Sequence, residues 1–191
     1  MAYAVILSRR RNRASENEKT IACVRGSKEV CRLKKKASVD PNYCNNTVLR
    51  QATRRMGQLY DSIIAPSGLR ATQLGLLTHV VSLGEPTMRE LAEDMVMDQS
   101  ALGHTLKPLE RSGYLELIVD PQDRRARRIR LTQAGTRKFE DTLVLWKTAQ
   151  DSFEAAFGAE KAAELRAVLT FLASDDFELA FNAPTPRAPG D

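Results

Sequence analysis

The sequence contains little of what protein export, metal binding or a membrane anchor requires. Its 191 residues include only three cysteines, Cys23, Cys31 and Cys44, and two histidines. An odd number of cysteines without CxxC spacing favours neither a disulfide framework nor a zinc site, and it fits a reducing cytoplasm. The short apolar run in MAYAVILSRRRNR precedes its arginines, and no apolar segment reaches the length of a membrane span. We therefore expect a cytoplasmic protein without metal, cofactor or membrane partner.

Sequence motifs for enzymatic chemistry are also missing. The chain has no GxSxG motif, no glycine loop that would cradle a phosphate, and no histidine and carboxylate pattern with metal-ligand spacing. We expect that the protein is not an enzyme.

The net charge of +5 is concentrated at the start of the chain. Residues 1–40 hold 11 Lys and Arg against 4 Asp and Glu, which leaves 18 against 20 in the remainder. Overall basicity is therefore weak evidence for nucleic-acid binding, and local clusters must carry that argument. We interpret the polar and basic residues 1–43 as a flexible arm and residues 183–191 as a flexible tail.

Apolar periodicity from residue 49 onward predicts four helices in succession. The first ends near Pro66, and the second ends near Gly84. A capping box formed by Thr87 and Glu90 begins a short third helix, and Asp98 can cap the fourth. The predicted inner faces are Leu49, Ala52, Met56, Leu59 and Ile63 in the first helix, Leu74, Leu77, Val80 and Val81 in the second, and Leu102, Leu106 and Leu109 in the fourth.

After Gly113 the apolar period changes from helical to two, which indicates strands. The segment DPQDRRARRIRLT, residues 120–132, provides turn residues followed by five arginines within seven positions. This pattern predicts a β-hairpin with an arginine-rich tip. Two helices joined by a turn and followed by a hairpin form a winged helix-turn-helix, in which the second helix enters the DNA major groove. Arginine at the hairpin tip, or wing, suits the narrow and electronegative minor groove.

The order and spacing of these motifs resemble the MarR family of bacterial winged-helix regulators. The resemblance covers residues from about 46 to 175 and is carried by a capped T-x-x-x-L-A helix, L-x-x-L-E-x-x-G-Y, D-P-x-D-R-R and L-T-x-x-G. It implies a homodimer that binds a pseudo-palindromic operator and is released by a small ligand or by oxidation. Two features depart from the family pattern: residues 1–43 have no counterpart, and Arg70 stands where an N-capping Ser or Thr is common.

The predicted fold is mainly α with a small β-hairpin wing, and residues 67–137 form the winged helix-turn-helix. Residues 44–66 and 138–182 form a helical dimerisation region, since Thr132 can cap a long helix and residues 165–172 mark one more. A monomeric helical cap that folds back on itself is the alternative. The predicted dimer interface comprises Leu49, Met56, Leu59, Phe139, Leu143, Trp146, Phe153, Leu169 and Leu172.

The outward face of the fourth helix supplies the predicted DNA contacts. Gln99 can pair with adenine, Lys107 can reach guanine or phosphate, and Ser100 can anchor a phosphate at the helix N-terminus. The resemblance implies that Arg125 pairs with Asp98, which leaves Arg124 for the minor groove. For Arg127, Arg128 and Arg130, a solvated strand face and a phosphate contact stay open. The full predicted DNA-binding set is Gln99, Ser100, Gly103, His104, Lys107, Arg124, Arg125 and Arg127.

The sequence leaves three hypotheses open for what the protein senses or binds. The family pocket lies between the first, second and long helices, so the resemblance implies ligand contacts by Arg54, Tyr60, His79 and Trp146, with an aromatic acid as a suitable ligand. Cys44 lies near the start of the first helix, where the helix dipole favours a thiolate, so redox sensing is an alternative. In the sequence, Cys44 stands about two residues before the position of the sensing cysteine in related regulators. A third hypothesis is a winged-helix module that binds protein instead of DNA.

Overall fold

The computed structural model describes residue 40 and residues 43–184. The chain divides into two compact units, Met1–Val48 and Leu49–Asp191. The predicted arm, residues 1–43, and the predicted tail, residues 183–191, lie almost wholly outside the described residues. In the part of the chain that is described, no helix is both long enough and apolar enough to cross a membrane.

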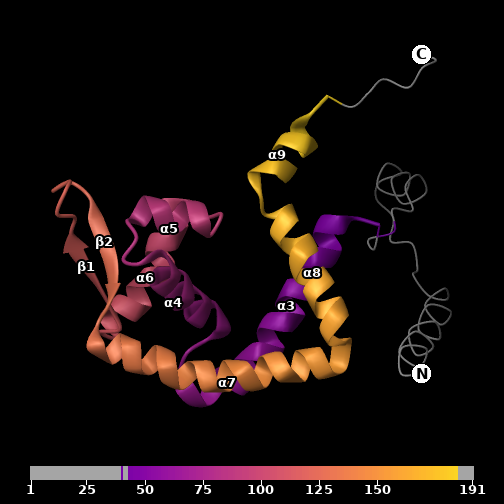
Figure 1. Cartoon of the computed structure of the whole chain (residues 1–191), viewed down its shortest axis with the longest axis horizontal. Helices are drawn as coiled ribbons and strands as arrows, with labels where there is room; N and C mark the ends of the chain where they lie inside the picture. The colour runs from indigo at the N-terminus through magenta and orange to yellow at the C-terminus, as the bar shows by residue number, and fades with distance from the viewer. Residues whose placement is uncertain (1–39, 41–42, 185–191) are drawn as a thin grey trace, which may run out of the picture. The chain divides into compact units, whose positions relative to one another are not determined.

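Helix α3 spans Asn45–Ile64 and therefore begins four residues before the predicted apolar seam (Figure 1). It is followed by a short 3-10 helix, η1, at Ala65–Ser67. Gly68 then adopts a left-handed conformation, with φ of 75°, that glycine tolerates without a steric penalty. The predicted end of the first helix near Pro66 is confirmed.

Helix α4 spans Ala71–Leu83, and an aspartate from the preceding helix caps its start. Arg70 occupies the N-cap position, where its side chain offers no acceptor. The Asp61 carboxylate instead accepts a hydrogen bond of 2.7 Å from the Ala71 amide. Gln73 Oε1 accepts from the Arg70 amide at 2.9 Å. Free amides at the helix start are thus satisfied despite the unusual Arg70.

The predicted inner stripe of α4 is wrong at one position, Val81. Leu74, Leu77 and Val80 are buried as predicted, whereas Val81 is half exposed and Leu76 is fully buried in its place. The reason is that α4 contacts α5, α7 and β2 at once, so the buried surface of the helix is wider than a single stripe.

Helices α5, Met88–Asp94, and α6, Gln99–Arg111, form the helix-turn-helix. The predicted capping box is confirmed, because Thr87 Oγ1 accepts from the Glu90 amide and Glu90 Oε2 accepts from the Thr87 amide. Asp98 caps α6 by accepting from the Ala101 amide at 2.7 Å. The predicted inner face of α6, Leu102, Leu106 and Leu109, is buried.

Strands β1, Leu115–Val119, and β2, Arg127–Leu131, form the predicted antiparallel hairpin. Its register pairs Leu115 with Leu131 and Leu117 with Ile129. Ile129 is fully buried and donates its amide to the Pro86 carbonyl at 2.8 Å. The hairpin is therefore attached through its second strand to the loop between α4 and α5.

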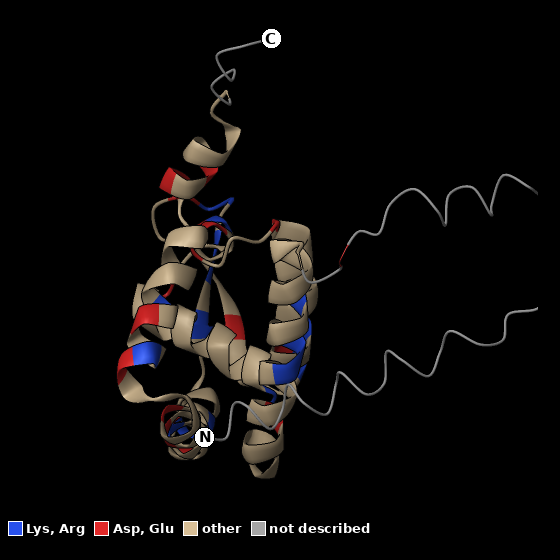
Figure 2. Cartoon of the chain, turned by 90° about the vertical axis from the view of Figure 1, so that its right-hand side faces the viewer, with Lys and Arg blue, Asp and Glu red and all other residues tan. Residues whose placement is uncertain are grey.

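Helix α7, Gln133–Phe157, begins at the predicted cap, where Thr132 Oγ1 accepts from the Gly135 amide at 3.0 Å. The helix predicted at residues 165–172 is α8, Ala159–Leu172, and a further helix that was not predicted, α9, follows it at Asp175–Asn182. Ser174 separates them because its hydroxyl caps α9 through the Phe177 amide. The first turn of α9 is acidic, as the red segment nearest the C-terminus in Figure 2 shows.

The main hydrophobic core lies within the winged-helix unit. It is formed by residues on either side of η1, by residues of α4, α5 and α6, and by residues of both strands. Its buried members are Ile64, Leu69, Leu74, Leu76, Leu77, Val80, Leu91, Ala92, Leu102, Leu106, Leu109, Leu115 and Ile129.

Candidate nucleic-acid interface

The face of α6 opposite the core carries the predicted DNA-contacting side chains. Gln99, Ser100, His104 and Lys107 are exposed, and Gly103 between them is half-buried. A Cβ added to Gly103 would meet no atom within 4 Å, so this part of the helix surface is open. One face of a single helix thus presents amide, hydroxyl, imidazole and ammonium groups to solvent.

The wing arginines fall into two groups. Arg124, Arg125 and Arg127 are exposed and, among the residues that the structure describes, take part in no ion pair. Arg128 and Arg130, by contrast, each bind carboxylates of the same chain. The tip therefore carries three guanidinium groups that are free to meet an external anion.

The predicted ion pair between Asp98 and Arg125 is not formed. The Asp98 carboxylate caps α6. At the exposed wing tip, the Arg125 amide donates to Asp123 Oδ1 at 2.9 Å. A hydrogen bond between Asp98 and an amide three residues ahead orders only a short stretch of chain, so its entropic cost is smaller than that of a contact with another element.

The buried carboxylate of Asp120 organises the wing turn, a role that the sequence interpretation missed. Asp120 Oδ1 accepts from the amides of Gln122, at 2.6 Å, and Asp123, at 3.2 Å, and Oδ2 accepts from Arg128 Nε at 2.7 Å. The Gln122 amide, followed by the Asp123 amide and the Arg128 guanidinium, holds the pKa of Asp120 below its ordinary value against the opposing effect of burial. An aspartate that starts an Asx turn two residues before its partner amide is the sequence signal that points to this role.

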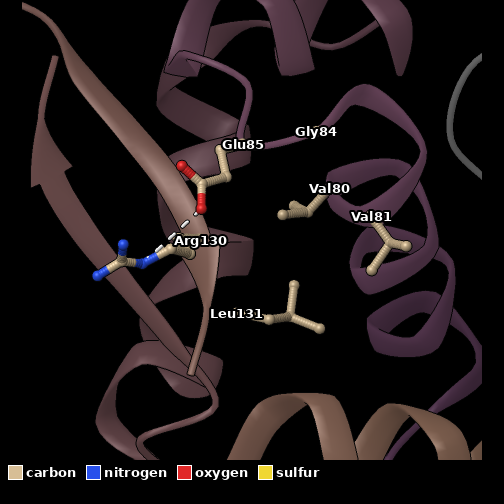
Figure 3. A pocket seen from close by; sticks show the side chains of 6 residues that line it. All are labelled: Val80, Val81, Gly84, Glu85, Arg130 and Leu131. Atoms are coloured by element: carbon tan, nitrogen blue, oxygen red, sulfur yellow. Dashed lines mark ion pairs between the residues drawn. The ribbon is translucent and has the colours of Figure 1, made fainter. Parts of the chain in front are cut away.

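Arg130 is held on the other side of the wing base. Its Nη2 lies 2.8 Å from Glu116 Oε1, and its Nε lies 3.9 Å from Glu85 Oε1. The Glu116 carboxylate, and more weakly that of Glu85, raises the pKa of Arg130. Beside this pair is a cavity of about 240 Å³, with an apolar wall formed by Val80, Val81 and Leu131, shown in Figure 3.

The four residues of the predicted ligand pocket line neither this cavity nor a second one next to the wing turn. Tyr60 donates to Gln150 Oε1 of α7 at 2.9 Å, and its pKa is raised first by burial and then by Glu154. His79 Nδ1 lies 2.5 Å from Asp94 Oδ2 of α5. Arg54 and Trp146 are exposed. The structure thus gives His79 and Tyr60 separate partners and does not bring the four side chains together in either cavity.

Cys44 is an exposed free thiol immediately before α3. Hydrogen bonds from the Thr47 side chain, and then from the Thr47 and Asn46 amides, lower the pKa of this thiol. Cys23 and Cys31 lie outside the described residues. Within residues 40 and 43–184, no three His, Cys, Asp or Glu side chains are arranged to hold a metal ion.

The predicted dimer-interface residues differ in their surroundings. Phe139 and Leu143 pack against the core of their own chain. Met56 is half-buried, and half-buried Phe153 stacks on Phe157 with ring centroids 5.4 Å apart. The remaining five, Leu49, Leu59, Trp146, Leu169 and Leu172, are between 38 and 50% exposed.

A helix-turn-helix whose second helix is followed by a two-stranded wing defines the winged helix-turn-helix class of proteins. A MarR family model matches residues 67–126. The HTH-type transcriptional regulator YdcH of Bacillus subtilis, itself uncharacterized, is 28% identical over 120 residues, which cover 61% of this chain and 82% of YdcH.

Solved structures agree with this class. The M. tuberculosis transcriptional regulator MosR, solved in complex with DNA, is 30% identical, with a TM-score of 0.57 over 66% of this chain and 96% of that one. PcaV of Streptomyces coelicolor, solved with its natural ligand, is 23% identical, with a TM-score of 0.64 over 73% of this chain and 99% of that one. Residues 67–126 of the chain are thus a domain of the MarR family, which consists of transcriptional regulators.

Proposed function

We propose that the protein is a homodimeric transcriptional repressor that binds a pseudo-palindromic operator and is released by a small molecule. The observation that carries this proposal is the pairing of an exposed polar face on α6 with three unpaired arginines on the adjoining wing. A helix and a wing with these side chains fit adjacent major and minor grooves of duplex DNA. MosR in its complex with DNA supports the same use of the fold.

Three exposed side chains of α6 each have a chemical role in this proposal. The Gln99 amide pairs with adenine, and Lys107 reaches guanine or a phosphate. Ser100, at the N-terminal turn of α6, binds a phosphate together with free helix amides. At the wing tip, Arg124 enters the minor groove, where the negative potential of A·T-rich DNA attracts a guanidinium group.

The dimer follows from the need to read two half-sites about one helical turn apart. The exposed apolar side chains of α3, α7 and α8 supply a surface for a second copy. Repression and release are what the resemblance to the MarR family implies, and PcaV, which was solved with its natural ligand, supports the binding of a small molecule by this fold. The class of effector in our proposal is an aromatic carboxylate, as the resemblance implies.

Binding to duplex DNA tests this function directly. The full chain is used to select operators from a random duplex pool, and the affinity for a selected duplex is then measured by fluorescence anisotropy over a range of salt concentrations. Lys107→Ala should weaken binding and reduce the salt slope by about one released counterion, and Gln99→Ala should cost about 1–3 kcal/mol and relax base preference.

Lys161→Ala is the matched control, because Lys161 is an exposed lysine on α8 outside the proposed interface. Unchanged affinity and salt slope in both α6 variants would contradict the assignment. Absence of salt-dependent duplex binding by the wild type would favour a winged-helix module that binds protein.

Redox release is a second candidate signal, favoured by the lowered pKa of the exposed Cys44 thiol. A thiol with a lowered pKa is more ionised near neutral pH, and the thiolate is the form that oxidants attack. In that case low peroxide or hypochlorite releases the wild type from its operator, and Cys44→Ser stays bound. Equal oxidant sensitivity of the two proteins leaves ligand binding as the signal.

A further inference from the structure

Arg128 donates hydrogen bonds to two separate segments of the chain, the wing turn and the α4–α5 loop. Its Nε donates to Asp120 Oδ2 at 2.7 Å, and its Nη1 donates to the Glu85 carbonyl at 3.0 Å. Asp120 begins the wing turn, and Glu85 lies in the loop between α4 and α5. One guanidinium group therefore joins the tip of the wing to the body of the domain.

The Asp120 end of this link is buried and fully used. One carboxylate oxygen accepts the two turn amides described above, and the other accepts Arg128. The Asp120 side chain is 5% exposed, against 28% for Arg128. Charge-assisted hydrogen bonds shielded from water are the stronger kind, so any motion of the turn relative to Arg128 breaks a costly contact.

The Glu85 end of the link is built into the backbone. Glu85 has φ of 62°, a left-handed conformation that is unfavourable for a residue with a side chain, and it follows Gly84 with φ of 66°. The carbonyl oxygen of Glu85, within this turn, accepts a hydrogen bond from Arg128 Nη1. The next two residues, Pro86 and Thr87, also contact β2. The Pro86 carbonyl accepts a hydrogen bond from the Ile129 amide, and Thr87 forms an isolated antiparallel β-bridge with Arg128.

The Glu85 side chain adds a second, longer contact to the same strand. Its carboxylate lies 3.9 Å from Arg130 Nε, and both residues line the cavity in Figure 3. Arg128 and Arg130 thus both turn toward carboxylates and a carbonyl of their own chain. Successive residues of a strand point to opposite faces, so Arg127 does not share the face of Arg128 and Arg130, and its side chain is exposed.

From this geometry we propose that Arg128 is a wing-positioning residue that does not contact DNA. It fixes the wing turn against the α4–α5 loop, and it thereby sets where the free arginines of the tip meet the DNA. This inference rests on the proposed DNA-binding function. It also separates Arg128 from Arg127, although the two are adjacent members of the same arginine cluster.

Substitution by lysine distinguishes positioning from direct contact. Lysine keeps the positive charge that a phosphate needs, but its single ammonium group cannot replace the planar fork that reaches both Asp120 and the Glu85 carbonyl. Arg128→Lys should therefore lose about as much affinity for the selected duplex as Arg128→Ala, on the order of tenfold. At Arg127, lysine should retain clearly more affinity than alanine. If Arg128→Lys binds as tightly as the wild type while Arg128→Ala does not, the proposal is wrong.

Asp120→Asn provides a second variant that preserves the shape of the turn. Asparagine Oδ1 can still accept the two turn amides, but its NH₂ group cannot accept from Arg128. The Asp120→Asn and Arg128→Lys losses should not add in the double variant, because both remove the same link. Additive losses would overturn the assignment even if one single variant folds poorly.

A measurement without DNA keeps this inference separate from the proposed function. In the DNA-free protein, NMR hydrogen exchange at the Gln122 and Asp123 amides should be about tenfold faster in Arg128→Lys than in the wild type. Arg127→Lys should leave this exchange unchanged. If the wild type binds no duplex, the proposed function fails, and the exchange rates still decide whether Arg128 orders the wing. Unchanged exchange in Arg128→Lys would contradict the inference by itself.

Discussion

Gly135 is buried at the point where the first turn of α7 passes the backbone of Tyr114. A Cβ built on Gly135 would collide with the Tyr114 carbonyl oxygen. This close approach gives a physical reason for the glycine in the L-T-x-x-G pattern, because the Tyr114 carbonyl also accepts the Thr132 amide at 3.1 Å and so cannot move freely. The backbone, and not a flexible side chain, sets the limit.

We predict that Gly135→Ala lowers the free energy of unfolding by about 1–3 kcal/mol, because it overpacks a rigid site. Chemical denaturation followed by circular dichroism measures this. Gly75→Ala is the matched control, since Gly75 lies inside α4 and an added Cβ there meets nothing within 4 Å. That variant should gain about 0.5–1 kcal/mol from reduced backbone entropy of the unfolded chain. Equal effects of the two substitutions would refute the steric explanation.

The lowered pKa of the Cys44 thiol has its main cause in Thr47. The Thr47 hydroxyl is the largest cause that lowers the thiol pKa. Thr47→Val should raise that pKa, so a smaller fraction of Cys44 is thiolate at neutral pH and alkylation by iodoacetamide is slower. The rate is followed against pH by mass spectrometry of the Cys44 peptide, which separates it from Cys23 and Cys31. Thr47→Ser keeps a hydroxyl and should behave as the wild type, and a profile unmoved by Thr47→Val would exclude the hydrogen bond as the cause.

At the scale of elements, the start of α4 depends on a residue that is not in α4. Because Arg70 offers no side-chain acceptor, the Ala71 amide relies on Asp61. We predict that Asp61→Ala destabilises the fold by about 1 kcal/mol, the usual cost of removing a helix cap. Thermal or chemical unfolding measures the loss.

An intramolecular rescue makes this prediction specific. Arg70→Ser supplies the missing N-cap hydroxyl, so the double variant Asp61→Ala/Arg70→Ser should recover most of the lost stability. If Arg70→Ser stabilises the wild-type protein and the Asp61→Ala variant by the same amount, the two residues do not share a role and the capping explanation fails.

The difference between Asp61 and the other caps shows which elements a sequence can predict. Thr87, Asp98 and Thr132 each accept an amide three residues ahead, so the contact is a local pattern and was predicted correctly. Asp61 reaches an amide ten residues ahead, across η1, and no local pattern indicates it. The same limit explains Leu76, which is buried because neighbouring elements cover α4 on more than one side.

The candidate site divides in the same way. The outward face of α6 follows from the predicted inner leucines, since a helix places its remaining positions opposite them. The partition of the arginines does not follow, because it depends on carboxylates and a carbonyl that the fold brings to β2 from the wing turn, β1 and the α4–α5 loop. The structure does not form the predicted Asp98–Arg125 pair, and Asp98 there accepts from the Ala101 amide.

At the scale of the whole molecule, the apolar surface of α8 is larger than a monomer needs. Leu165, Val168, Leu169 and Leu172 all lie on α8 and are at least 36% exposed, whereas the winged-helix core is closed without them. Exposed apolar side chains gathered on one element mark an interaction surface, and a homodimer uses the same surface from both copies. The wing arginines and α6 are then presented twice, as an operator with two half-sites requires.

We predict that Leu169→Asp disrupts the dimer while each chain stays folded. Placing a charge in an apolar interface should raise the dimer dissociation constant by about thirtyfold or more, because a central interface residue contributes about 2 kcal/mol. Sedimentation equilibrium measures the dissociation constant, and circular dichroism checks the fold. Val81→Asp is the matched control, because Val81 is 50% exposed on α4 and lies outside the predicted interface. Affinity for a two-half-site operator should fall in Leu169→Asp and persist in Val81→Asp. A wild type that sediments as a monomer, or a Leu169→Asp variant with wild-type association, would instead support the monomeric helical cap.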